Sequence, residues 1–360
     1  MSERGRRRVG EDRISFLPDH LLCQILSDLP TKIAVRTCVF SKRWKSVWLS
    51  VPLLDLDVSE SPAGYSEFAS WIHNAVMRKV QHLDVVICRL SYIGEKLMPL
   101  SLYTCESLVS LKLNNVSLAD FENVSLPRLK IMHLVDNRYA NDAHLENLIS
   151  SCPVLEDLKV VRYVEREYIV KVLRVRSQSL KILKLVLDSD GYRASKYDDL
   201  EVAIDAPGLS YLSLEDHQSK RFVISSLSSL AKVDIDVSFD AVRIVVRNVA
   251  LKRSVVRNFL TSLSSVTDMT MSGTTLTLLS RYMRHETAAP VSLHDPILCV
   301  KYFLENSAVL KKFTLQLGCK RMEKESIIFM ELLRFRRCSA SCEVHVGLDG
   351  TYPNVIHKFL

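Results

Sequence analysis

Glycine is scarce in this chain, with 10 among 360 residues. This excludes a collagen-like or low-complexity chain and leaves little material for a glycine-rich loop that cradles phosphates. No apolar run reaches the roughly eighteen residues that a transmembrane helix needs, so we expect no membrane span. The opening residues, MSERGRRRVGEDR, lack the apolar core of a signal peptide. We therefore expect the protein in the nucleus, the cytoplasm or both.

The sequence also lacks the motifs that mark most active sites and metal centres. It contains no HExxH, GxSxG, GxxxxGK(S/T) or GxGxxG pattern, and its 10 histidines are dispersed. Its 9 cysteines form no CxxC pair, and Cys338 and Cys342, the closest two, have no second pair nearby. We therefore expect no enzymatic activity, no metal site and no cofactor. The cysteines are interpreted as small buried apolar side chains in a reducing compartment.

A stretch near the N-terminus, residues 17–48, reads LPDHLLCQILSDLPTKIAVRTCVFSKRWKSVW and predicts three short helices. Along its first part, apolar side chains recur at helical spacing and form one wide stripe. Pro30 ends this helix, because the residue before a proline is pushed out of the α region. Thr31 is the expected N-cap of the second helix, and Ser41 is the expected N-cap of the third.

The apolar surface of these helices leaves two explanations open. About a dozen apolar residues on three short helices cannot all be buried against one another, and chains below about 40 residues rarely fold alone. Either the helices cap the rest of this chain, or they dock on a partner protein. The physics of the segment alone favours neither explanation.

The same stretch resembles the F-box of large plant protein families. The resemblance is carried by Leu17-Pro18-Asp19, Ile25-Leu26, Leu29-Pro30, Ala34-Val35, Val39, Ser41-Lys42-Arg43-Trp44 and Trp48. It implies docking on a Skp-type adaptor, which connects to a cullin–RING ubiquitin ligase. By this resemblance, ten side chains make or support the adaptor contact: Leu17, Pro18, Leu21, Ile25, Leu26, Leu29, Pro30, Val39, Trp44 and Trp48.

Beyond residue 48 one pattern recurs: an apolar residue, two others, an apolar residue, one other, and a third apolar residue. Its ten copies begin at Val51, Val80, Leu108, Leu129, Leu155, Leu180, Leu209, Leu230, Val266 and Leu310. Seven of the nine intervals between starts are 21 to 29 residues, the period of leucine-rich repeats. Each closing triplet alternates like a short strand, and stacked copies bury a continuous core. The pattern predicts an irregular solenoid with a parallel β-sheet and with helices or loops on its convex side.

Segments between the triplets support this interpretation. Residues 142–151, DAHLENLISS, predict a helix that returns the chain to the next strand. The sequence SSCPVLEDLKV resembles the repeat unit of plant F-box/leucine-rich-repeat proteins. Residues 71–87 resemble that family's first inter-repeat helix and strand, and residues 259–280 resemble a later pair.

The outward positions of the predicted strands line a concave surface. They mix charge, histidine and tyrosine, which suits protein recognition, although an ordinary solvated sheet face has the same composition. Six residues are the candidates for binding a target protein: Lys112, His133, Lys159, Lys184, Tyr211 and Lys232.

The C-terminal block, residues 298–347, predicts helix, strand, helix and strand. The first strand covers residues 310–317, the second helix 327–335 and the last strand 342–346. The block resembles the FBD module that often closes plant F-box repeat proteins, and it can cap the open end of a repeat stack. Before this block, the segment at 271–300 is shorter than expected, because relatives with this layout usually carry one or two more repeats there. We expect either a shorter solenoid or an irregular junction.

The expected fold is therefore α/β, with a small three-helix F-box, a leucine-rich-repeat solenoid and a small α/β cap. Its expected divisions are a disordered basic arm at 1–11, the F-box at 12–50, the solenoid at 51–285, an irregular junction at 286–297, the FBD module at 298–347 and a tail at 348–360.

The resemblance implies a non-catalytic substrate-recognition subunit of an SCF (Skp–cullin–F-box) ubiquitin ligase. The F-box would bind the adaptor, and the repeats would bind an unidentified target protein for proteasomal degradation. The alternative is a repeat-based binding scaffold outside ubiquitination, with the N-terminal helices as a cap. Four arginines within residues 4–8 raise nucleic-acid binding as a third function, but no aromatic interleaving or recognition helix supports it. Because the repeats have their own C-terminal cap, the docking explanation for residues 17–48 is favoured.

Overall fold

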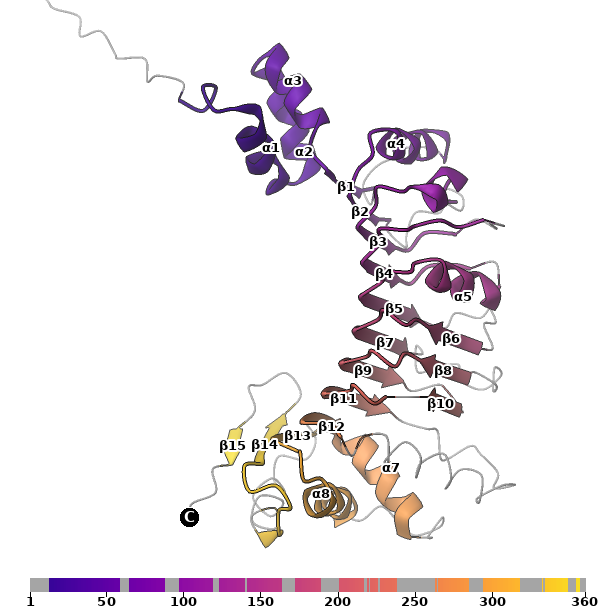
Figure 1. Ribbon diagram of the computed structural model, residues 1–360, viewed down its shortest axis with the longest axis vertical. Helices are drawn as coiled ribbons and strands as arrows, with labels where there is room; N and C mark the ends of the chain where they lie inside the picture. Colours follow the sequence, from indigo (N-terminus) through magenta and orange to yellow (C-terminus); the bar gives the residue numbers. More distant parts are fainter. Residues whose placement is uncertain are drawn as a thin grey trace, which may run out of the picture.

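The computed structural model is a curved solenoid with a small helical unit at its N-terminal end (Figure 1). It describes residues 13–58, 65–87, 97–118, 123–139, 141–163, 172–188, 201–216, 219, 221–225, 227–237, 263, 265–284, 294–317, 332, 334–348 and 354–356. The predicted basic arm, residues 1–11, lies outside the described residues, and so do most of residues 286–297.

The N-terminal unit contains three α-helices and a 3-10 turn. They are α1 (Asp19–Ser27), α2 (Thr31–Arg36), η1 (Thr37–Val39) and α3 (Lys42–Leu49). The third helix begins as the sequence predicts, because the Ser41 side chain accepts a hydrogen bond from the backbone N–H of Trp44 at 3.4 Å. The prediction of Thr31 as an N-cap is wrong. Thr31 is the first helical residue, Pro30 precedes it as the cap, and the Thr31 hydroxyl is bonded elsewhere.

The main sheet has twelve strands and runs the whole length of the solenoid. In spatial order they are β1 (Leu53–Asp57), β2 (His82–Val86), β3 (Ser110–Asn114), β4 (Ile131–Val135), β5 (Asp157–Tyr163), β7 (Ile182–Asp188), β9 (Tyr211–Asp216), β11 (Lys232–Val237), β12 (Asp268–Ser272), β13 (Lys312–Leu317), β14 (Glu343–Leu348) and β15 (Asn354–Ile356). All neighbours pair in parallel except β14 and β15. Every one of the ten predicted triplets lies in one of the strands from β1 to β13.

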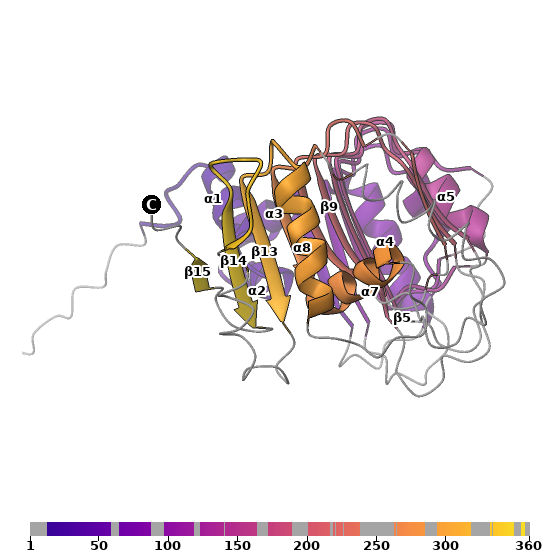
Figure 2. The same ribbon diagram turned by 90° about the horizontal axis from the view of Figure 1, so that it is seen from below.

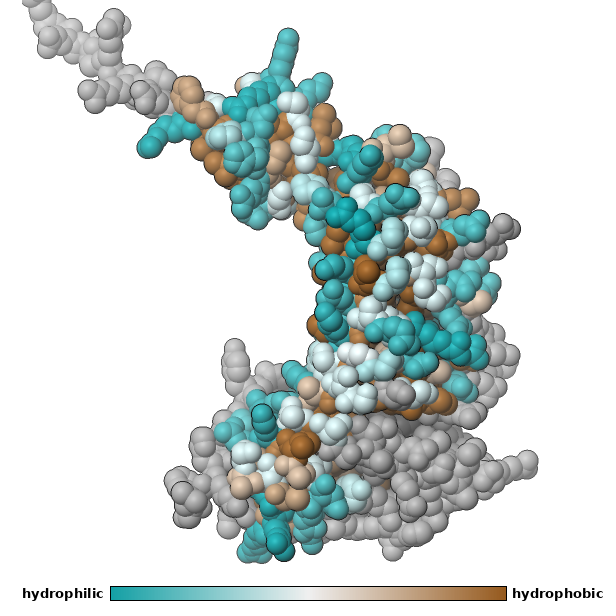
Figure 3. All heavy atoms as spheres, in the orientation of Figure 1, coloured by the Kyte–Doolittle hydropathy of each residue, from teal (hydrophilic) through white to brown (hydrophobic). Residues whose placement is uncertain are grey.

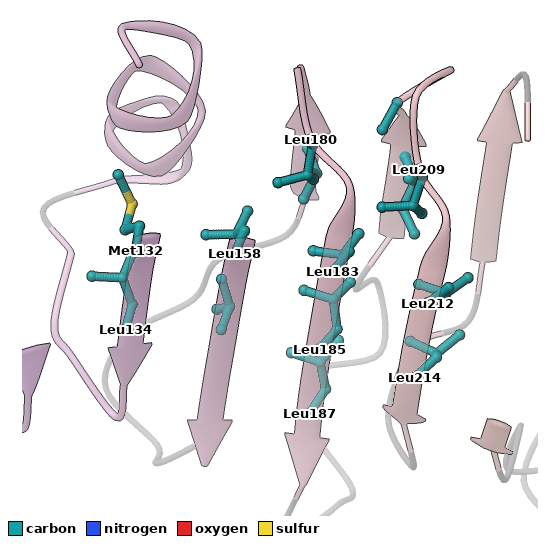
Figure 4. Packing of buried hydrophobic residues seen from close by; sticks show 14 of the residues in the cluster. Met132, Leu134, Leu158, Leu180, Leu183, Leu185, Leu187, Leu209, Leu212 and Leu214 are labelled. Carbon is teal, nitrogen blue, oxygen red and sulfur yellow. The ribbon is translucent and has the colours of Figure 1, made fainter. Parts of the chain in front are cut away.

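The core lies directly behind this sheet. Alternate residues of the strands point inward, and these align in register across the stack, as Leu158, Leu183 and Leu212 do (Figure 4). The leading residue of each repeat is buried as well. That of the first repeat, Val51, packs with the N-terminal helices instead of the main core. No repeat hides its apolar face alone, so stability arises from contacts between neighbours.

The convex side is more varied than the sequence indicates. It carries α4 (Tyr65–Met77), η2 (Leu100–Thr104), α5 (Asp142–Ser150), α7 (Gly273–Arg284) and α8 (His294–Asn306), which lie on the outer side of the curve in Figure 1. Between α5 and α7 the chain forms a second parallel sheet from β6 (Val172–Arg176), β8 (Glu201–Asp205) and β10 (Arg221–Ser225). The prediction of only helices and loops is wrong there, because these segments alternate apolar and polar residues and bury one face.

The solenoid continues through the predicted junction. Strand β12 pairs directly with β13, so the C-terminal block extends the main sheet rather than forming a separate layer. Helices α7 and α8 occupy the interval between the two strands and pack against each other, as Figure 2 shows from below. Residues 294–297, expected to be irregular, begin α8. Strand β15 lies within the expected tail and covers the edge of β14, whereas most of the predicted helix at 327–335 falls outside the described residues.

Side chains tie consecutive repeats together where they leave the sheet. The buried Asn137 amide accepts a hydrogen bond from the Val116 N–H at 2.9 Å and donates one to the Leu113 carbonyl at 3.0 Å. On the entering side, the Ser107 hydroxyl donates to the Val80 carbonyl at 2.9 Å, one repeat earlier. These bonds satisfy backbone groups that the ladder leaves unpaired in the turns.

The described cysteines are all free, and most are buried. Burial raises the pKa of the Cys152 and Cys299 thiols to about 12, so both are uncharged apolar groups at neutral pH. Cys338 differs, because it is exposed. Within the described part of the chain, no helix is long and apolar enough to cross a membrane, and no cluster of ligating side chains is arranged for a metal ion.

Candidate functional sites: the N-terminal helices and the concave face

The N-terminal helices have a small core of their own. Six residues form it: Leu22, Leu26, Ala34, Trp44, Val47 and Val51. The Trp44 ring meets Phe40 edge to face, with centroids 5.7 Å apart. Two of the ten predicted adaptor residues, Leu26 and Trp44, therefore lie inside this core. They are buried and support the shape of the unit rather than its exposed surface.

The remaining predicted adaptor residues lie at or near the surface. Val39 is 83% exposed, Ile25 is 44% exposed, and Leu21, Pro18 and Pro30 are also exposed. Three others, Leu17, Leu29 and Trp48, are half-buried against the core. Sequence reasoning missed several exposed apolar side chains of the same unit: Ile14, Phe16, Ile33, Val35, Phe40 and Leu49. The sequence could not single them out, because the buried and the exposed positions of this unit are occupied by the same kinds of apolar residue. Brown residues lie among teal ones on the surface of this unit in Figure 3, in keeping with the exposed apolar side chains named above.

The helical unit is fastened to the first strand of the sheet. The Asp55 carboxylate accepts hydrogen bonds from the backbone N–H of Thr31, at 2.5 Å, and from its hydroxyl. In return, the Thr31 hydroxyl accepts from the Asp55 N–H at 2.9 Å. Thr31 thus covers a backbone donor of β1, the edge strand, which would otherwise be open to pairing with another chain.

Arg78, just after α4, makes a second attachment. Its guanidinium donates to the Leu49 carbonyl at 2.9 and 3.1 Å and to the Trp48 carbonyl at 3.1 Å, and it lies 4.6 Å from the centroid of the Trp48 ring. A cation at the last carbonyls of a helix complements the helix dipole. Burial lowers the pKa of Arg78 without removing its charge. The two attachments set the angle between the helices and the solenoid.

Replacing Arg78 by alanine should loosen α3 without unfolding the sheet. Hydrogen bonds to charged groups contribute about 1.5–3 kcal/mol, so the last turn of α3 should exchange its amide hydrogens about tenfold faster or more. Hydrogen exchange read by mass spectrometry measures this, with protection in β3 to β9 unchanged. Gln81→Ala, at an exposed side chain nearby, serves as the control. Equal protection of α3 in both variants would contradict the assigned role.

The concave face is lined by the outward residues of the main sheet. Lys112, His133, Lys159 and Lys184 are Cα partners across β3, β4, β5 and β7. Tyr211 and Lys232 are likewise partners, on β9 and β11, but two residues earlier along their strands. All six predicted target-binding residues thus lie on this face, in two adjacent columns. The space-filling view shows the molecule hollowed on this side (Figure 3).

Comparison with known proteins matches both parts of the chain. The model of the F-box domain matches residues 14–56, and the model described as FBD-associated F-box protein At5g56370, LRR repeats, matches residues 68–267. The putative F-box/FBD/LRR-repeat protein At5g22670 of Arabidopsis thaliana is 55% identical, over 94% of this chain and 98% of its own length. The F-box/FBD/LRR-repeat protein At5g22660 of the same plant is 41% identical, over 96% and 99%. The chain belongs to the F-box/FBD/LRR-repeat family.

This membership confirms the resemblance on which the domain predictions rest. The alignment with the first relative extends over 439 residues, whereas 94% of this 360-residue chain is about 338. About 100 positions of that alignment therefore have no counterpart here. The F-box is the N-terminal helical unit, and the repeats are the strands that stack upon it.

Charged groups on the concave face of the repeats are arranged in local pairs. Lys112 lies 4.0 Å from Asp84, and the His133 imidazole lies 3.6 Å from the Asp157 carboxylate. Burial lowers the pKa of His133 and outweighs the opposing effect of Asp157, so the imidazole is neutral at pH 7.

Tyr211 is the centre of a second group. The Lys184 and Lys232 ammonium groups lie 5.8 and 4.9 Å from its ring centroid, and its hydroxyl donates to Asp234. Burial and this carboxylate raise the pKa of Tyr211 to about 12, so the hydroxyl keeps its proton and remains a donor. This arrangement can bind charged and aromatic groups.

Proposed function

We propose that this protein is a substrate-recognition subunit of an SCF ubiquitin ligase. F-box domains generally bind Skp1-type adaptors in SCF complexes, which supports adaptor binding by residues 14–56. The observation that carries the proposal is the division of this unit into a buried core and an exposed apolar surface. Val39 and Ile25 represent that surface, and they have no partner side chain in the main core. The target protein binds the concave face of the repeats.

The protein itself performs no bond chemistry in this proposal. It raises the effective concentration of a target lysine near the ubiquitin-loaded enzyme, and well-oriented proximity accelerates a reaction strongly. A fixed angle between F-box and solenoid serves this role, because a target held on the concave face is then presented in one direction. Thr31 and Arg78 fix that angle through their bonds to Asp55 and to the end of α3. We place this activity in the nucleus, the cytoplasm or both.

The double substitution Ile25→Asp and Val39→Asp tests the adaptor contact. Burying one aliphatic side chain contributes about 1.5–3 kcal/mol, so losing two should weaken binding to a Skp-type adaptor at least about 100-fold. Affinity is measured by titrating the purified chain with labelled adaptor. Both residues are exposed in the free chain, so the thermal unfolding midpoint should change little.

Leu100→Asp is the matched control, because Leu100 is 60% exposed and lies outside the F-box. It should leave adaptor affinity unchanged. Adaptor binding that survives the double substitution would place the interface elsewhere on the chain.

A binding scaffold outside ubiquitination remains the second candidate, and one contact favours it. The Thr31 hydroxyl accepts a hydrogen bond from the backbone of β1, and shielding an edge strand in this way is what a structural cap does. Under this alternative the native chain has no affinity for a Skp-type adaptor in the same titration. The two candidates thus differ before any substitution is made.

A further inference from the structure

A column of basic side chains crosses four adjacent strands on the concave face. It consists of Lys112, His133, Lys159 and Lys184, which are Cα partners in β3, β4, β5 and β7. Neighbouring parallel strands lie about 4.8 Å apart, so the column spans about 14 Å. An extended polypeptide covers about 13.5 Å from residue i to residue i+4, and residues i, i+2 and i+4 face the same way. Three alternate residues of an extended segment therefore match the length of the column.

An apolar column runs beside the basic one, two residues further along each strand. In register across β2, β3, β4, β5 and β7, its members are Val86, Asn114, Val135, Val161 and Val186. All but Asn114 are valines. These valines point to the concave side and do not belong to the main core. Val161 is only 6% exposed, whereas its partners Val135 and Val186 are half-buried. On the other side of the basic column, Ile131 and Ile182 also face the concave side, so the valines are one of two partly apolar strips there.

The charge of the column comes from its three lysines, because the His133 imidazole is neutral at pH 7 and lies 3.6 Å from Asp157. Lys112 has one distant carboxylate, Asp84 at 4.0 Å, at the end of the column. Among the described residues, neither Lys159 nor Lys184 forms an ion pair, and Lys184 instead lies over the ring of Tyr211. On the far side the column continues to Ser213 and then to the acidic Asp234. The positive stretch is therefore bounded by Asp84 on β2 and Asp234 on β11.

We propose that this double column binds an extended segment of the target protein in which acidic and aliphatic side chains alternate. The segment crosses the strands along the seam between the two columns. Successive side chains of an extended chain point to opposite sides. Acidic ones would then reach Lys112, Lys159 and Lys184, while aliphatic ones lie on Val135, Val161 and Val186. The inference rests on the proposed function in one respect, namely that the bound segment belongs to a ubiquitination target. The binding surface itself consists of solenoid residues and does not involve the F-box.

A fluorescent peptide of alternating glutamate and valine tests the proposal against the full-length chain. We expect saturable binding by fluorescence anisotropy that weakens as salt is added, because the attracting charges are partly exposed. Two peptides are compared with it. One carries glutamine in place of glutamate, and the other has the same composition with its glutamates adjacent. Each should bind at least about tenfold more weakly, as the first loses charge and the second loses the alternation.

Charge reversal on the protein locates the peptide. Lys159→Glu with Lys184→Glu should weaken binding about tenfold or more. Lys311→Glu with Lys312→Glu changes the net charge equally at two exposed lysines near the C-terminal end of the sheet, and it should leave the affinity unchanged. Val186→Asp should weaken binding of the alternating peptide by a similar factor. Equal affinity for the three peptides, or equal losses in the two lysine variants, would overturn the proposal.

The adaptor titration separates this inference from the proposed function. The variant Lys159→Glu with Lys184→Glu should bind a Skp-type adaptor as the native chain does. A chain that binds the adaptor but not the alternating peptide overturns the inference alone. A chain that binds the peptide at these lysines but no adaptor supports the inference and overturns the ligase assignment.

Discussion

Replacing Trp44 by alanine should unfold the F-box while the repeats remain folded. Trp44 is 6% exposed and is the largest of the six side chains in the F-box core. Truncating a buried tryptophan costs about 3–5 kcal/mol, a large share of the stability of so small a core. The solenoid has a separate core, so it should keep its structure. Hydrogen exchange should show lost protection in α1, α2 and α3 and native protection in β3 to β9.

Val39→Ala is the matched control for this experiment. Val39 is exposed, and substitutions at such positions usually change stability by less than about 0.5 kcal/mol. It should leave exchange in all three helices unchanged while weakening adaptor binding. The pair of variants separates a residue that supports the interface from one that forms it. Retained protection of the helices in Trp44→Ala would show that the F-box is stabilised mainly by its attachments to β1 and Arg78.

Leu183→Ala should destabilise the solenoid as a whole. Leu183 is completely buried on β7, in the middle of the stack, with Leu158 and Leu212 as its Cα partners on the two neighbouring strands (Figure 4). Truncating a buried leucine costs about 2–5 kcal/mol, because the transfer free energy is lost and a cavity remains. Each repeat is stabilised by its neighbours, so damage at the centre weakens both halves. The denaturant midpoint of the sheet signal should fall clearly.

Leu100→Ala provides the comparison for Leu183→Ala. The same atoms are removed, but Leu100 is mostly exposed, so the midpoint should hardly move. A small shift of the denaturant midpoint for Leu183→Ala would mean that neighbouring side chains move to fill the cavity left by the substitution. A biphasic unfolding curve would instead mean that its two halves unfold independently at this point.

The strands of the solenoid could be predicted because their signal is local. Ten apolar triplets recurred, seven of the nine intervals between them being 21 to 29 residues, and each proved to lie in a strand of one sheet. Alternation also fixed which residue of each triplet faces outward, so Lys112, His133 and Lys159 were placed on the concave face correctly. The second sheet on the convex side was missed. Its strands, β6, β8 and β10, are five residues each and lie between the starts of successive main-sheet repeats, where a returning helix or loop was expected.

The sequence by itself determined the repeat architecture, the third helix with its Ser41 cap, and the family. These depend on backbone sterics and on patterns within a few residues. The tertiary structure alone decided which apolar residues of the F-box are buried: Trp44 packs inside the unit, whereas Val39 faces outward. It also decided how the F-box is attached. Thr31 and Asp55 are 24 residues apart, and Arg78 is 29 residues from Leu49. Such contacts form only when separate elements meet, and no local pattern specifies where they meet.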